Sequence, residues 1–311
     1  MSEREIVCED LNLAIDGLKR DGFRLDLIYP ADDPHTAVLG KDGDSVRVTT
    51  NPDAPAPSDA LPPFAAEFVL TRASESAGQG RAGMLYRDLV PSRLGGRYIA
   101  SHISIPGGGP VADWVHYHRI AFQMIYVRRG WVRVVYQDGG EPFVMKEGDL
   151  VIQPPQIRHR VLESSAGLEV VEVSAPAIHA TFADHELELP NGSNPGRVYG
   201  GQYFLHHVAA ETPWTSADEG LAQETEVAVA TSGLAEVRTL RPRNGNSLSF
   251  GGHGGELVFG LVLDGSAALD YRGLHEVGPA DAFVIPPGQS WQLTHPSSDF
   301  RLLHVTTAPL D

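Results

Sequence analysis

The chain has 311 residues, 42% of them hydrophobic and 21% charged, with 33 glycines and 23 prolines, which is typical of a globular, turn-rich protein long enough for two domains. The formal net charge of −16 excludes sequence-independent attraction to nucleic acid or anionic membrane, and no apolar run reaches the roughly 20 residues of a membrane span, so we expect a soluble, cytoplasmic protein. Cys8 is the single cysteine, which excludes an internal disulfide and a thiolate-based metal site.

Residues 1–60 are predicted to form a small α+β extension. A helix is expected over residues 10–23, followed by strands over 23–30 and 45–50. The apolar face of this helix consists of Leu11, Ala14, Ile15 and Leu18. The proline-rich stretch 51–63 cannot form a strand ladder and therefore indicates a linker.

From about residue 80 the chain consists of short β-type runs separated by Gly, Pro, Asn and Asp. The runs form two sets on either side of the glycine-rich stretch 189–201. The sets match in order: FQMIYVRRGWVRVVYQDG, from Phe122, corresponds to LVFGLVLDGSAALDYRG, from Leu257, and GDLVIQPPQIRH corresponds to ADAFVIPPGQSW. We therefore predict a mainly β fold with two tandem barrels, over residues 80–190 and 197–311.

His116, His118, Gln123 and His159 are candidate metal ligands. In a strand, residues two apart face the same side, so His116 and His118 point together, and a turn can bring Gln123 to the same place. A later antiparallel strand can deliver His159 beside them. Neutral nitrogen and oxygen donors suit a divalent first-row metal. An isolated pair of strand histidines is more often a surface pair or a hydrogen-bonded core pair than a metal site.

These residues lie in a pattern that resembles the two motifs of the cupin superfamily. The first motif, G-x5-H-x-H-x3,4-E-x6-G, corresponds to HYHRIAFQ, residues 116–123, followed by six residues and Gly130. The second motif, G-x5-P-x-G-x2-H-x3-N, corresponds to Gly148, Pro154, His159 and Glu163. The leading glycine of the first motif is displaced, Gln156 and Glu163 replace a glycine and an asparagine of the second, and Gln123 replaces the glutamate ligand.

The resemblance implies two cupin barrels with one metal site, in the first barrel only. His116, His118 and His159 would be the histidine ligands, and Gln123 would stand where the carboxylate ligand usually lies. The second copy has Gly251, His253, Val258 and Trp291 at the matching positions, so it keeps one of four ligands. We expect this copy to be structural.

Strand alternation predicts the orientation of several other side chains. Tyr98 and His102 share a face of one strand, and we predict that they line the barrel beside the metal as catalytic residues; a packed core tyrosine and a hydrogen-bonded histidine are equally ordinary. Trp114 shares the face of His116. Arg119, Arg158 and Arg160 should point away from the site, and surface positions are expected for His179, His185, His206 and His207.

Cupins with three histidines and no glutamate include oxygen-activating dioxygenases. The leading hypothesis is a mononuclear non-haem metal-dependent dioxygenase for a small anionic chelating substrate of phenolic, enolic or diketone type. The cofactor would be one divalent metal ion, Fe(II) first, with Ni, Mn, Cu, Co and Zn as alternatives. A metal-dependent cyclase, isomerase or lyase, or a non-enzymatic small-molecule-binding cupin, are the alternatives. Expected partners are a small-molecule substrate, dioxygen and a second copy in a homodimer, with no nucleic acid and no membrane.

Overall fold

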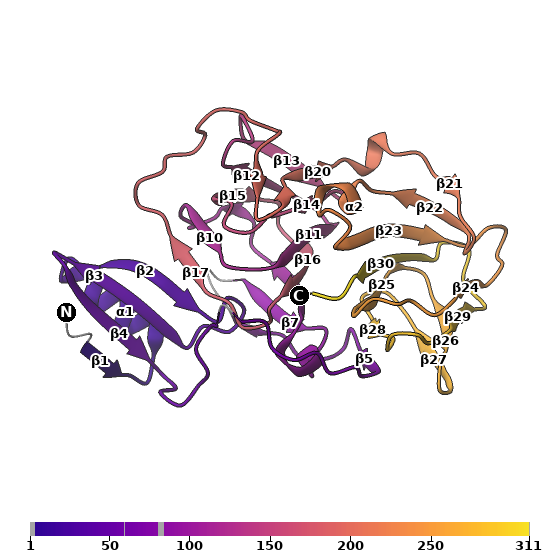
Figure 1. Ribbon diagram of the computed structural model, residues 1–311, viewed down its shortest axis with the longest axis horizontal. Helices are drawn as coiled ribbons and strands as arrows, with labels where there is room; N and C mark the ends of the chain where they lie inside the picture. Colours follow the sequence, from indigo (N-terminus) through magenta and orange to yellow (C-terminus); the bar gives the residue numbers. More distant parts are fainter. Residues whose placement is uncertain (1–3, 59, 80–83, 311) are drawn as a thin grey trace.

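The computed structural model describes residues 4–58, 60–79 and 84–310. It contains a small α+β unit at the N-terminus, a first barrel, and a second barrel beside it (Figure 1). The prediction of a mainly β fold with two tandem barrels is confirmed.

The N-terminal unit packs one helix against a sheet. Helix α1, Leu11–Arg20, begins at Asp10, whose side chain accepts a hydrogen bond of 3.0 Å from the Leu13 backbone N–H, and ends with basic residues in its last turn. Leu11 and Ile15 of the helix are buried against the sheet. The strands of this sheet are β1 (Arg4–Val7), β2 (Arg24–Tyr29), β3 (Thr36–Lys41) and β4 (Asp44–Thr49). The predicted helix and both predicted strands are present.

The first barrel consists of two facing sheets. One sheet has the order β1-β4-β3-β2-β17-β10-β15-β12-β13, with β9 attached to β15, and the other has the order β20-β14-β11-β16-β8-β7-β6. The strands are β6 (Gly78–Gln79), β7 (Leu85–Asp88), β8 (Ile99–Ile105), β9 (Gly109–Pro110), β10 (His116–His118), β11 (Phe122–Arg129), β12 (Trp131–Tyr136), β13 (Phe143–Lys146), β14 (Leu150–Ile152), β15 (His159–Ser164), β16 (Leu168–Ala175) and β17 (Thr181–Ala183). The N-terminal unit therefore continues one sheet of the barrel through the β2–β17 pairing.

The second barrel repeats this pairing. Its sheets have the orders β24-β29-β26-β27 and β21-β22-β23-β30-β25-β28-β5. The strands are β21 (Thr215–Ser216), β22 (Leu221–Glu224), β23 (Ala235–Arg241), β24 (Leu248–Phe250), β25 (Val258–Asp264), β26 (Ala267–Asp270), β27 (Leu274–Val277), β28 (Ala282–Val284), β29 (Trp291–Thr294) and β30 (Arg301–Thr307). A short helix, α2 (Val227–Ala230), precedes β23, and 3₁₀ turns occupy Arg93–Gly96 (η2) and Ala209–Glu211 (η3).

Each barrel receives an edge strand from a distant part of the chain, outside its own predicted segment. Strand β20 (Leu205–His207) pairs with β14 of the first barrel, and β5 (Val69–Thr71) pairs with β28 of the second. A separate two-stranded ribbon, β18 (Val198–Tyr199) and β19 (Gln202–Tyr203), precedes β20. The predicted domain boundaries stay predictions, and residue 80, the predicted start of the first barrel, lies outside the described residues.

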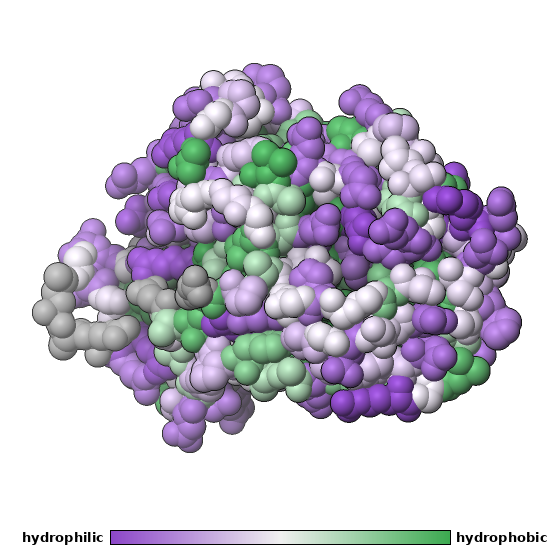
Figure 2. Space-filling view, turned by 45° about the vertical axis from the view of Figure 1, so that its right-hand side comes forward, coloured by the Kyte–Doolittle hydropathy of each residue, from purple (hydrophilic) through white to green (hydrophobic). Residues whose placement is uncertain are grey.

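A continuous hydrophobic core joins the two barrels. It contains Phe122 and Met124 of β11 together with Phe259 and Leu261 of β25, all fully buried. On the visible face of the molecule, hydrophobic residues form several separate groups among hydrophilic ones (Figure 2). Within the described ranges, no helix is long and apolar enough to cross a membrane.

Candidate metal centre

The pairing of β10 with β15 brings three histidines together. His116 lies directly opposite His159 across the antiparallel pair, and His118 projects from the same face of β10. One ring nitrogen from each of the three lies within 4.8 Å of the others, and all three residues are buried. The ring centroids of His116 and His159 are 4.2 Å apart. The structure thus assembles the three histidines that the motif singled out.

Backbone carbonyls orient all three rings in the same sense. The Nδ1 atom of His116 donates to Trp114 O at 2.7 Å, that of His118 lies 3.3 Å from Ala180 O, and that of His159 lies 3.1 Å from Ile157 O. A carbonyl oxygen only accepts, so each Nδ1 carries the hydrogen and each Nε2 carries the lone pair. Metal-binding histidines are held in this tautomer by such bonds.

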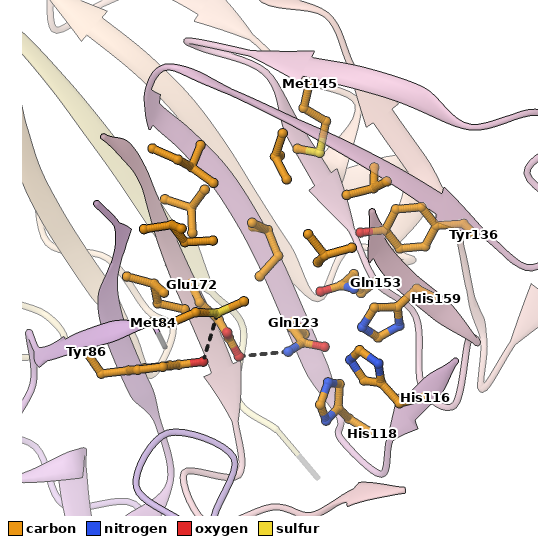
Figure 3. A pocket seen from close by; sticks show the side chains of 18 residues that line it. Met84, Tyr86, His116, His118, Gln123, Tyr136, Met145, Gln153, His159 and Glu172 are labelled. Atoms are coloured by element: carbon orange, nitrogen blue, oxygen red, sulfur yellow. Dashed lines mark hydrogen bonds between the residues drawn. The ribbon is translucent and has the colours of Figure 1, made fainter. Parts of the chain in front are cut away.

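Gln123 lies beside the histidines on β11 (Figure 3). Its residue exposure is 2%, and its Nε2 donates to Glu172 Oε1 at 2.7 Å. The amide oxygen, Oε1, is buried and has no hydrogen-bond partner among the described residues. A buried oxygen with an unused lone pair fits a metal ion or a metal-bound water, which is the place the first motif assigns to Gln123.

The histidines and Gln123 line a cavity of about 100 Å³ inside the first barrel. Figure 3 shows the polar side chains at one end and aliphatic side chains at the other. The polar lining includes Tyr136 and Gln153, and the aliphatic lining consists of Met84, Ile103, Ile105, Ile125, Val132, Val134, Met145, Val161, Leu168 and Val170. The Tyr136 ring stacks on His159 at 5.5 Å, and burial raises the pKa of this phenol, so it stays protonated at neutral pH.

Tyr98 and His102 do not line this cavity, so the prediction that they do is wrong. His102 lies on β8 and Tyr98 directly precedes this strand, but Ile103 and Ile105 line the cavity, so the strand face opposite His102 is the inner one. His102 Nε2 lies 2.9 Å from Glu169 Oε2. Tyr98 OH lies 2.7 Å from Thr307 Oγ1 in the core between the barrels, where burial raises its pKa. Alternation established which residues share a face, but not which face is inside.

The remaining predictions concern side chains expected to point away from the site or to lie at the surface. Arg158 lies over the Tyr117 ring at 4.2 Å and pairs with Asp184, on the outer face of β10. His179 was expected at the surface, but it is buried with 3% exposure and its ring lies 5.3 Å from that of His118. The segment before β17 carries His179 inward because β17 joins the barrel sheet. His185 is exposed, as expected.

Glu172 is the main site residue that the motifs did not reveal. It projects from β16 into the cavity, where its Oε1 also accepts from Ser174 Oγ at 2.8 Å. The sequence does carry a signal for it. Leu168, Val170 and Glu172 share a strand face, and an acidic residue that continues an apolar alternation is a candidate inward-facing group. Tyr86 and Gln153 also line the cavity without any motif to mark them.

The second barrel has no comparable cluster within the described ranges. Its strand register pairs Phe250 with Trp291, as the first barrel pairs His116 with His159. Phe250, rather than Gly251, therefore stands at the position of His116, so that match was wrong by one residue. The matches of Val258 to Gln123 and Trp291 to His159 agree with the register.

Two facing sheets with a histidine cluster on one inner face define a cupin barrel, and residues 101–174 match the family model described as a cupin domain. Residues 101–174 of the first barrel are therefore a cupin domain, as the motif resemblance indicated, and the second barrel repeats its strand pairing. A comparison with curated protein sequences finds no significant match.

Solved structures share this two-barrel fold at low sequence identity. The protein YlbA from E. coli is 13% identical, with 78% of this chain and 91% of that chain covered and a TM-score of 0.56. A mutant of the oxalate decarboxylase OxdC from Bacillus subtilis is 12% identical, covering 81% and 80%, with a TM-score of 0.55. The putative glyoxylate-induced protein from Pseudomonas aeruginosa is 12% identical, covering 83% and 94%, with a TM-score of 0.56. At these identities the likeness concerns the fold alone.

Proposed function

We propose that the first barrel is a mononuclear non-haem metal-dependent dioxygenase acting on a small anionic substrate that chelates the metal. The observation that carries this proposal is the neutral donor set: three imidazole Nε2 atoms and the amide oxygen of Gln123, with no carboxylate among them. A neutral set leaves the full charge of a divalent ion available, which favours an anionic substrate such as a phenolate or enolate.

The residues fit such an ion, and each has a definable task. When bound, the metal would supply a Lewis acid and a place for substrate and dioxygen side by side. The backbone carbonyls hold the three rings in the ligating tautomer, and the buried amide oxygen of Gln123 would be the fourth donor to the same ion. The aliphatic part of the cavity would bury the body of the substrate and exclude water. The small cavity favours a compact substrate with one polar, chelating end.

A second candidate is a metal-dependent lyase, cyclase or isomerase using the same ligands. Glu172 is the specific observation in its favour. Its carboxylate lines the cavity beside the three histidines and could take a proton from a bound substrate. One structural neighbour is a mutant of an oxalate decarboxylase, and this likeness of fold supports the lyase class. A binding protein without activity is the third alternative.

Dioxygen consumption separates these candidates. Purified protein would be analysed for metal and then reloaded with Fe(II), Mn(II), Ni(II) or Zn(II) in turn. Each form would be tested with phenolic, enolic and diketone compounds in an oxygen electrode and, in parallel, by mass spectrometry of the products. Uptake with incorporation of oxygen into product supports the dioxygenase. Product formation without uptake supports the lyase class, and binding without product supports the third alternative. His159→Ala serves as the control without metal.

Fe(II) as the metal, dioxygen as co-substrate and a homodimer as the working state remain predictions from the cupin resemblance. Light scattering at micromolar concentration tests the last of these, and a monomer would contradict it.

A further inference from the structure

Gln123 lies between the histidine cluster on one side and Glu172 on the other (Figure 3). The two residues come from adjacent strands: Gln123 of β11 is opposite Ser174 of β16, and Glu172 is opposite Ile125. Side chains two positions away across a strand pair are diagonal neighbours on one face, within reach of a long side chain. The 2.7 Å bond between Gln123 Nε2 and Glu172 Oε1 uses this geometry.

This bond selects one of the two orientations of the amide. An ionised carboxylate has no hydrogen to donate, so only the NH₂ group of Gln123 can face Glu172. The amide oxygen must then point to the opposite side. Glu172 is itself fixed, because Ser174 Oγ donates to the same Oε1 at 2.8 Å. Gln123 Oε1 is buried and has no hydrogen-bond partner in the described part of the chain, as expected of an oxygen kept for a ligand.

We propose that Glu172 is a positioning residue that holds Gln123 Oε1 toward the three histidines as the fourth donor of the metal site. The carboxylate that the first cupin motif would place at position 123 is then still present, but on the neighbouring strand and one hydrogen bond removed from the metal. The metal keeps a neutral set of donors, and the negative charge stabilises it only through the amide. This inference rests on the proposed metal-binding function and assigns a role within it.

Replacing Glu172 by glutamine tests the orientation directly. A glutamine at position 172 can donate or accept, so the bond to Gln123 survives in either orientation of both amides. In one of these orientations the Gln123 NH₂ group faces the metal and cannot ligate it. Loss of an outer partner of a metal ligand typically weakens metal binding about 10- to 100-fold, so we expect Glu172→Gln to weaken Co²⁺ binding about tenfold.

An exchange of the two side chains provides the decisive variant. In the double variant Gln123→Glu/Glu172→Gln, the amide at 172 can only donate to the carboxylate at 123, so the orientation is fixed again and a carboxylate oxygen faces the histidines. We expect Co²⁺ affinity at or above that of the wild type. Glu163→Gln is the matched control, since Glu163 is an acidic strand residue of the same barrel that does not line the cavity.

The experiment is a Co²⁺ titration of the metal-free wild type and the three variants, followed through the visible absorption bands of the bound ion. Weaker binding with altered bands in Glu172→Gln, recovery in the exchange variant and no change in Glu163→Gln support the inference. Wild-type affinity and bands in Glu172→Gln overturn it, and so does a loss that the exchange does not recover, which would mean that Glu172 only stabilises the fold. A wild type that binds no Co²⁺ would instead overturn the metal function itself.

Discussion

In the first barrel Ile125 of β11 faces Val151 of β14, and in the second barrel the equivalent pair is Gly260 and Phe283. The Phe283 ring occupies the space beside Gly260. A Cβ atom on this glycine would lie 2.3 Å from the ring, so only glycine leaves room for it. In the first barrel, the Ile125–Val151 pair consists of two aliphatic side chains, and Ile125 borders a cavity. In the second barrel, the Gly260–Phe283 pair places a large ring inside the barrel.

The same contrast holds at the metal positions. Where the first barrel has His116 and His159, the second has Phe250 and Trp291, whose rings stack at 3.8 Å and an interplanar angle of 2°. At the position of Glu172 the second barrel has His304, buried beside these rings. Identical strand pairing therefore supports either a polar cavity or a closed aromatic core, and the choice depends on a few inward-facing residues.

The first prediction concerns metal stoichiometry, where the two barrels should differ completely. The wild type should bind one divalent metal ion per chain, and His159→Ala should abolish binding because two histidines and an amide remain. His253→Ala, in the second barrel, should bind metal like the wild type, because His253 Nδ1 only accepts a bond from Gly255 N–H. Metal analysis after dialysis checks this, and two equivalents per wild-type chain would contradict it.

The second prediction concerns packing. Phe283→Ala should lower the free energy of unfolding by about 3–5 kcal/mol, since it removes a fully buried ring and leaves a cavity. Ile125→Ala in the first barrel should cost less, about 2 kcal/mol, because Ile125 already borders a cavity and mainly transfer free energy is lost. Denaturant unfolding of both variants measures the difference. Equal losses would mean that the first barrel is packed as tightly as the second.

Strand periodicity and the two motifs predicted the duplicated fold and the three histidines, because both signals are local in sequence. The positions of Tyr98 and His102 could not be predicted, since alternation leaves open which face of β8 meets the second barrel. Glu172 could not be assigned to Gln123 for a related reason: their contact depends on the register of β11 against β16, which the sequence leaves undetermined. The same uncertainty produced the one-residue error between Gly251 and Phe250.

The third prediction uses the buried histidine of the second barrel. Burial, followed by the nearby charges of Arg238 and His253, lowers the pKa of His304 from 6.5 to about 3. Between these values the unfolded chain binds a proton that the folded chain does not, so stability falls as the pH falls below 6.5. From neutral pH to pH 5 the loss from this group is about 2 kcal/mol.

His304→Leu should remove this part of the pH dependence. Unfolding free energies at pH 7 and pH 5 should then differ less in the variant than in the wild type. The exposed His295 provides the control, because His295→Asn should leave the pH dependence unchanged. Identical slopes in His304→Leu and the wild type would show that His304 is protonated equally in the folded and unfolded states.

The last prediction concerns Gln123, which stands where the second barrel has Val258. Gln123→Glu places a second carboxylate against Glu172, in the position of a 2.7 Å bond, and so destabilises the metal-free protein. A divalent ion relieves this repulsion and gains an anionic ligand, so metal should be retained or bound more tightly. Consequently, metal should raise the melting temperature more in this variant than in the wild type.

Substrate binding should respond in the opposite direction. An anionic chelator would meet a less positive ion with a less available coordination position, and a loss of about 1.4 kcal/mol corresponds to tenfold weaker binding. Gln123→Ala should instead keep the three histidines and part of the metal while losing the placement of the amide. Metal content and turnover would be measured on the same preparations of the wild type and both variants. If Gln123→Glu loses metal, or if both variants turn over like the wild type, Gln123 does not face the metal, and the first barrel would bind its ion with three histidines alone.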